Sequence, residues 1–185
     1  MARNITPVLD DSVALLARTP ATLDALLRGL PDVWTLRNEG SGTWTARDVV
    51  AHLTELERTD WMPRVRRLLT FGETRPFDRV DRGAFRRNAR GKSLSQLLGE
   101  FARRRKKNLD DLRRLELKRA DLGRRGRHPA LGMVTLSELV AAWAAHDLTH
   151  LHQIARILAH QHREAVGPWD KFLGVMQCTG HSASG

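Results

Sequence analysis

The sequence contains a single cysteine, Cys178, and no tyrosine among its 185 residues. A lone cysteine excludes an internal disulfide framework and suits a reducing compartment. No stretch approaches the roughly 18 consecutive apolar residues that a transmembrane helix requires. The N-terminal segment MARNITPVLDDSVALLARTP also lacks the apolar stretch of a signal peptide. We therefore expect a cytoplasmic protein that does not span a membrane.

Acidic residues are fewer than lysines and arginines, and the formal net charge of +10 raises the question of a nucleic-acid partner. The positive charge is mostly arginine and is spread along the chain, with its densest run at residues 103–114. Leu109 and Leu112 lie in that run at helical spacing, which predicts the solvated face of an amphipathic helix. Basic residues are not interleaved with aromatic ones as they are in a base-stacking surface. We therefore expect a small-molecule substrate and no nucleic acid.

The alternation of apolar and polar residues that marks β-strands is almost absent, and four amphipathic blocks indicate helices instead. The blocks cover about residues 7–30, from 45 to about 63, 93–115, and from 135 to about 162. The last three each begin with a capping-box pair, Thr45 with Asp48, Ser93 with Gln96, and Thr135 with Glu138. Residues 31–44, 71–83 and 123–134 are interpreted as loops, and residues 167–176 as a short closing helix.

Two prolines interrupt the helical pattern. Thr19-Pro20 predicts either a kink in the first helix or a restart of it. Pro63 predicts a kink in the second helix or its end. Taken together, the blocks predict an all-α fold, a four-helix bundle that forms a single domain over residues 1–178. Residues 179–185 are expected to form a frayed C-terminal tail.

The most distinctive segment is AAHDLTHLHQ, at residues 144–153. His146 and His150 are four positions apart, so on a helix they lie roughly 40° apart and one turn from each other. Such a pair can direct two ring nitrogens at one metal ion, whereas His152 points away from that face. With Gln153, the pair could equally form a buried hydrogen-bond network, since polar groups in an apolar stripe must be satisfied.

A third histidine, His52, lies on the core side of the second block with Val49 and Leu56. If the second and fourth helices face each other, His52 joins His146 and His150 in a three-nitrogen site. Three protein ligands leave one coordination position open, which is typical of a catalytic metal. Glu55 is a candidate base or hydrogen-bond partner there, or else a solvated surface acid.

These residues resemble the DinB-like (YfiT-like) superfamily of metal-dependent, mostly bacterial proteins. The resemblance runs from about residue 9 to 174 and rests on GSGTWTARDVVAHLTELERTDWMPRV, FARRRKKNLDDL, HPALGMVTLSELVAAWAAHDLTHLHQIARIL and VGPWDKFL. It implies a bundle of up-down-down-up topology in which His52, His146 and His150 bind a divalent ion such as zinc or nickel. It also implies a homodimer, as in many relatives, and in some of them the transfer of low-molecular-weight thiols such as bacillithiol or mycothiol.

Three functions remain open from the sequence. The first is a metal-dependent S-transferase, in which a low-molecular-weight thiol attacks an electrophilic substrate and Trp61 or Trp143 lines the site. The second is metal-dependent hydrolysis, of which HDLTH could be a zincin-like variant with Asp147 in place of glutamate. The only histidine after that motif that could complete a zincin is His181. The third is a stress-linked metal-binding protein that is not an enzyme.

Overall fold

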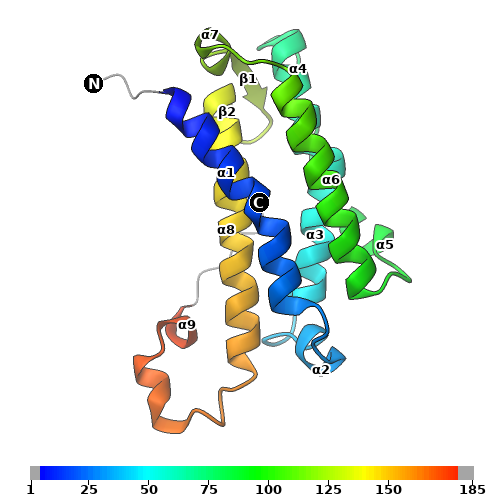
Figure 1. Cartoon of the computed structure of the whole chain (residues 1–185), viewed down its shortest axis with the longest axis vertical. Coiled ribbons are helices and arrows are strands. Elements are labelled where there is room, and N and C mark those ends of the chain that lie inside the picture. The colour runs from blue at the N-terminus through cyan, green and yellow to red at the C-terminus, as the bar shows by residue number, and fades with distance from the viewer. Residues whose placement is uncertain (1–4, 179–185) are drawn as a thin grey trace.

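A computed structural model describes residues 5–178, in which four long helical segments form the predicted bundle (Figure 1). The predicted frayed tail, residues 179–185, lies outside the described residues. The four segments are α1 (Ile5–Leu27), α3 (Ala46–Thr59) continued by α4 (Trp61–Phe71), α6 (Leu94–Arg114) and α8 (Leu136–His160). The short elements are α2 (Asp32–Thr35), α5 (Ala84–Asn88), α7 (Arg119–Leu122), β1 (Arg125–His128), β2 (Gly132–Thr135), the 3₁₀ helix η1 (Gly167–Phe172) and α9 (Gly174–Gln177).

The segment between α4 and α6 returns the chain to the opposite end of the bundle. As a result α3–α4 and α6 run in one direction while α1 and α8 run in the other, which is the up-down-down-up arrangement (Figure 1). A hydrogen bond from Arg28, just after α1, to Ser95 at the start of α6 joins these two ends of the helices. Helix α8 packs against α1, α3 and α4. The predicted all-α four-helix bundle is confirmed.

All three predicted capping boxes form. In each of them the side-chain oxygen of the first residue accepts a hydrogen bond from the backbone N–H three positions later. The carboxylate or amide of the later residue in turn accepts one from the N-cap backbone. These boxes set the starts of α3, α6 and α8, and so fix where along each helix its side chains face the core.

The two prolines differ in their effect. Helix α1 runs through Pro20 without ending. A proline leaves the carbonyl four residues earlier without its helical partner, and here that carbonyl, of Leu16, accepts a hydrogen bond of 2.8 Å from Arg105 Nη1. Pro63 does end a helix, since its ring would clash with the carbonyl of Thr59, and α3 stops at that residue.

One predicted loop was wrong. Residues 123–134 contain an antiparallel hairpin, with β1 paired to β2 in the register that places Gly126 opposite Val134. A side chain at Gly126 would come within 3.1 Å of Leu68 and Phe77. The glycine therefore lets the hairpin lie directly on α4, and tertiary packing rather than strand propensity explains it. The predicted loops 31–44 and 71–83 are irregular in the structure, apart from the single helical turn α2 and the last residue of α4.

The interior consists of two apolar clusters along the bundle axis, one containing Trp61 and Trp143 and the other containing Phe85 and Ile154. Within the basic run 103–114, Arg105 and Asn108 are buried, so the prediction that this run is only a solvated face was wrong at these two positions. None of the helices within residues 5–178 combines the length and the hydropathy needed to cross a bilayer.

Candidate metal centre

Three histidines meet inside the bundle where the two apolar clusters join. His52 comes from α3, and His146 and His150 come from α8. His146 Nε2 lies 3.3 Å from His52 Nε2 and 3.1 Å from His150 Nε2. One ligand atom from each ring lies within 4.8 Å of the other two. The structure thus brings together the three residues that the sequence predicted as metal ligands.

The spacing of the nitrogens fits a divalent metal ion. Zinc lies about 2.0–2.1 Å from imidazole nitrogens in tetrahedral sites, which places the ligand atoms roughly 3.3–3.4 Å apart. The two Nε2 to Nε2 distances around His146 are close to that value. Three imidazole nitrogens that face one another have more lone pairs than hydrogens to share. An ion at their centre would satisfy all three.

The surroundings of the Nδ1 atoms of His150 and His146 indicate that the Nε2 atoms of these rings are the ones available to a metal ion. His150 Nδ1 donates to Gln153 Oε1 across 2.7 Å, which fixes the tautomer and leaves the Nε2 lone pair free for a ligand. The Nδ1 atom of His146 is buried and has no hydrogen-bond partner among the described residues. For His146, the Nε2 side is therefore where polar interactions are made.

The sequence pattern of the DinB superfamily matches residues 15–154, well over half of the chain. The protein belongs to the DinB superfamily. Among solved structures, YfiT from Bacillus subtilis is similar over 85% of this chain and 87% of its own, with a TM-score of 0.70 and 22% sequence identity. That protein is described as a probable metal-dependent hydrolase with an unusual four-helix bundle topology. A comparison with curated proteins finds no match.

Aromatic rings surround the histidines of this DinB protein. The Trp44 ring lies 4.9 Å from that of His52 and is nearly parallel to that of His150 at 6.1 Å, between ring centroids. Phe85 meets His52 edge-on at 5.7 Å, and Trp61 meets His146 edge-on at 5.2 Å. Trp61 therefore lines the site, whereas Trp143 lies behind it, stacked on Trp61. Neither Trp44 nor Phe85 was predicted from the sequence to lie at the site.

Burial keeps the imidazoles neutral. Burial, together with the neighbouring His150, lowers the pKa of His52 to about 3 and that of His146 to about 2. The pKa of His150 is also lowered by burial. Because only a neutral imidazole can bind a metal ion, the fold keeps the three rings in the form that could bind one at physiological pH.

The carboxylates near the triad are engaged elsewhere. Glu55 is buried, not a solvated surface acid, and its oxygens accept hydrogen bonds from Arg58 and Asn88. Asp147 binds Arg105 through both of its oxygens, at 2.5 and 2.9 Å. An aspartate held in this way cannot act as the base of a zincin, and His181 lies outside the described residues. His152 is exposed, as its helical position predicted.

A buried polar network that the sequence analysis did not find lies behind the triad. Arg105 bridges Asp147 and Glu57, and the Glu57 carboxylate also accepts hydrogen bonds from Trp143 Nε1 at 2.9 Å and from Asn108 Nδ2 at 2.9 Å. Asp147 and Trp143 are respectively one residue after and three residues before His146 on α8. The network thus fixes the part of α8 that presents His146.

The depressed histidine pKa values predict a pH dependence of the metal-free protein. Unfolded histidines take up protons near pH 6.5, while folded His52 and His146 stay neutral down to about pH 3 and 2. The unfolded state therefore binds more protons, and the free energy of unfolding falls as the pH falls from about 7 to 4. In His146→Gln, the free energy of unfolding measured by urea titration should fall less steeply with pH than in wild type. The two slopes should differ by up to about 1.4 kcal/mol per pH unit.

Comparing wild type with His146→Gln isolates the contribution of His146 to the pH dependence of stability. Burial raises the pKa of Asp60 to about 6, which alone would make stability fall as the pH rises from about 4 to 6. That contribution is common to both proteins and cancels in their difference. Identical pH slopes for wild type and His146→Gln would contradict the prediction.

Proposed function

We propose that this DinB protein is a divalent-metal-dependent enzyme, with His52, His146 and His150 as ligands of a zinc or nickel ion, that joins a low-molecular-weight thiol to an electrophilic small molecule. The observation that carries the proposal is the convergence of three neutral imidazoles on one point, while the neighbouring carboxylates of Glu55 and Asp147 are both held by arginines. A bound divalent ion would supply Lewis acidity that lowers the pKa of a thiol there.

The protein's own side chains fit a reaction that needs no carboxylate base. Among the described residues, the acids closest in sequence to the ligands, Glu55 and Asp147, are both held by arginines. A thiol has a pKa near 8.5 and needs only a modest shift to ionise. Trp44, Trp61 and Phe85 form an apolar wall around the triad, which excludes water from the sulfur and offers a surface for an apolar electrophile.

Hydrolysis is the second candidate, and it is favoured by the similarity in fold to YfiT, which is described as a probable metal-dependent hydrolase. A three-histidine site can also lower the pKa of water to about 7 without a carboxylate base. In that case the same triad would serve, and Glu55 could act as a base only after leaving Arg58 and Asn88. The two functions share the ligands and differ in the nucleophile.

A thiol panel distinguishes the two. The purified protein, loaded with zinc or nickel, is incubated with bacillithiol, mycothiol or glutathione and monochlorobimane, and the fluorescent conjugate is followed. We expect conjugation above the uncatalysed rate with at least one thiol, lost on chelation and in His146→Ala. His152→Ala, an exposed histidine on the same helix, should keep the wild-type rate.

Two outcomes would overturn the proposal. Metal-dependent release of p-nitrophenol from an ester without any thiol requirement would favour hydrolysis. Stoichiometric metal binding with neither activity would favour a metal-binding protein that is not an enzyme.

A further inference from the structure

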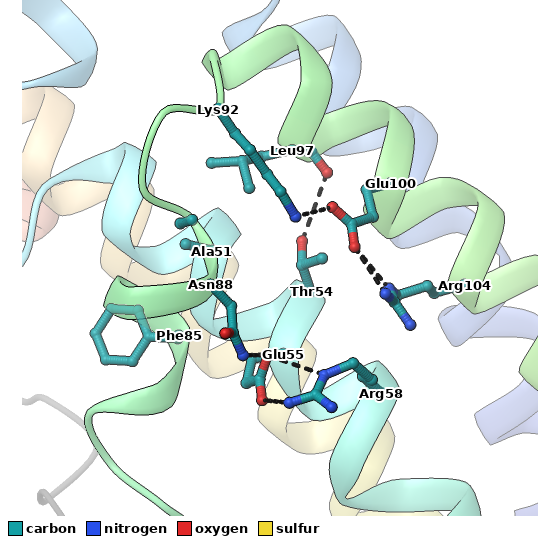
Figure 2. A pocket seen from close by; sticks show the side chains of 11 residues that line it. Ala51, Thr54, Glu55, Arg58, Phe85, Asn88, Lys92, Leu97, Glu100 and Arg104 are labelled. Atoms are coloured by element: carbon teal, nitrogen blue, oxygen red, sulfur yellow. Dashed lines mark hydrogen bonds and ion pairs between the residues drawn. The ribbon is translucent and has the colours of Figure 1, made fainter.

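Phe85, which contacts His52 of the triad, also lines a polar pocket. Its lining comes from α3, from α5, from the segment that joins α5 to α6, and from α6 itself (Figure 2). The pocket has a volume of about 270 Å³. Phe85 and Ala51 belong to its wall, and Ala51 directly precedes His52 on α3. Phe85 also meets His52 edge-on at 5.7 Å, so this side chain contacts both the pocket and the triad.

Three cations and two carboxylates line this pocket. Lys92, Arg104 and Arg58 reach it from three sides, as Figure 2 shows. Glu100 holds Lys92 at 2.7 Å and Arg104 at 2.8 Å, and Glu55 holds Arg58 at 2.5 Å. The carboxylates are mostly buried, whereas the three cations are about one third to one half exposed. The lining therefore has a net charge of +1, and the positive groups are the accessible ones.

The cations keep unused hydrogen-bond donors. Arg58 and Arg104 each bond their carboxylate through Nε and Nη2, so that within residues 5–178 neither Nη1 has an acceptor. The Lys92 ammonium makes one hydrogen bond, to Glu100, out of the three it can donate. The buried carboxylates thus hold the cations in position while part of each cation stays free for a ligand. Such pre-organisation reduces the entropy that a ligand must offset on binding.

We propose that this pocket binds a small organic anion, with a carboxylate or phosphate group against Arg58, Lys92 and Arg104 and a short apolar part against Ala51, Phe85 and Leu97. Charged donors bind carboxylate and phosphate groups through strong hydrogen bonds, and arginine does so most specifically. The volume is just below the range of about 300–1,000 Å³ for drug-sized ligands, so the ligand is about the size of an amino acid. In this proposal the Glu55 carboxylate holds Arg58 in position for the ligand.

Calorimetric titration of the purified metal-free protein at about 0.15 M salt tests the proposal. The probes are succinate, ethyl phosphate and the neutral isostere succinamide. We expect saturable one-to-one binding of at least one of the two anions and none of succinamide; the tighter anion identifies carboxylate or phosphate as the preferred group. Arg104→Gln and Lys92→Gln should each weaken binding at least tenfold. Both should fold, since Glu100 keeps one cation in either variant.

The matched control is Arg113→Gln, which removes the same charge from an exposed arginine of α6 that also pairs with an acid on its own helix. It should bind the anion with wild-type affinity. Because the titration is made without metal, its outcome is independent of metal binding at the triad. The absence of saturable binding of both anions, or an equal loss in Arg104→Gln and Arg113→Gln, would overturn the proposal.

Discussion

Replacing Arg105 by alanine is expected to lower the free energy of unfolding by about 3–5 kcal/mol, because it leaves buried carboxylates without their cation. The guanidinium of Arg105 binds both oxygens of Asp147 and one of Glu57, and none of the three side chains is more than 2% exposed. Glu57 keeps Asn108 and Trp143 as donors. Asp147 loses both hydrogen bonds that the structure gives its carboxylate. Urea denaturation at pH 7 measures the change.

Two further variants separate the contribution of the Arg105 charge to stability from that of its packing. In the triple variant Arg105→Met, Glu57→Gln and Asp147→Asn no charge remains in this network, so most of the lost stability should return. Arg113→Ala, on an exposed face of the same helix, should leave the urea midpoint unchanged. A triple variant as unstable as Arg105→Ala would show that the guanidinium stabilises the core through its packing on Phe101 and Trp143 and not through its charge.

Helical periodicity was sufficient to find the three histidines that the structure brings together. His146 and His150 repeat at a spacing of four, and His52 follows Val49 on the core side of its helix, so each position is determined by a pattern local to one helix. The relative placement of α3 and α8 was the one tertiary assumption. The three capping boxes fixed the starts of the helices, and hence which faces meet.

The apolar periodicity of α6 also indicated that Arg105 is buried, but its positive charge led to the prediction that it is on the surface. Arg105 lies four residues after Phe101 and four before Leu109, in the middle of the apolar stripe of α6. A charged residue there was assigned to the surface because arginine is seldom fully buried unless it is paired. Its partners, Glu57 and Asp147, are on other helices, and no pattern within one segment reveals such a pair. An ionisable residue in the centre of an apolar stripe is therefore better interpreted as one member of a buried cluster.

Trp44 and Phe85 could not be found in this way. They lie at the end of a loop and in a five-residue helix, where neither a period of 3.6 nor one of 2 applies. Their position against the triad depends on how the loops are anchored. Glu39, in the same loop as Trp44, pairs with Arg156 on α8 at 2.5 Å. Contacts of this kind between distant segments give the site its aromatic wall.

Loss of one imidazole should abolish tight metal binding without unfolding the bundle. We expect His52→Ala to lower the affinity for zinc and for nickel by more than about 100-fold, because even partners that only orient a ligand contribute 10–100-fold. Gln153→Leu, which removes the acceptor of His150 Nδ1, should cost about 10–100-fold. His152→Ala removes an exposed histidine two residues after His150 and should change nothing. Competition with a chelator of known affinity measures all three, with elemental analysis for the stoichiometry.

The order of these losses tests the geometry of the centre. His52 alone comes from α3, so its removal leaves a two-histidine clip on one helix, which any exposed pair at a spacing of four could form. A large loss in His52→Ala therefore means that the ion is held between α3 and α8. If His52→Ala keeps the wild-type affinity and one ion per chain, the three-histidine site is wrong, and the close approach of His52 to His146 is only a packing contact. If His152→Ala weakens binding as much as His52→Ala does, the metal lies on the outer face of α8.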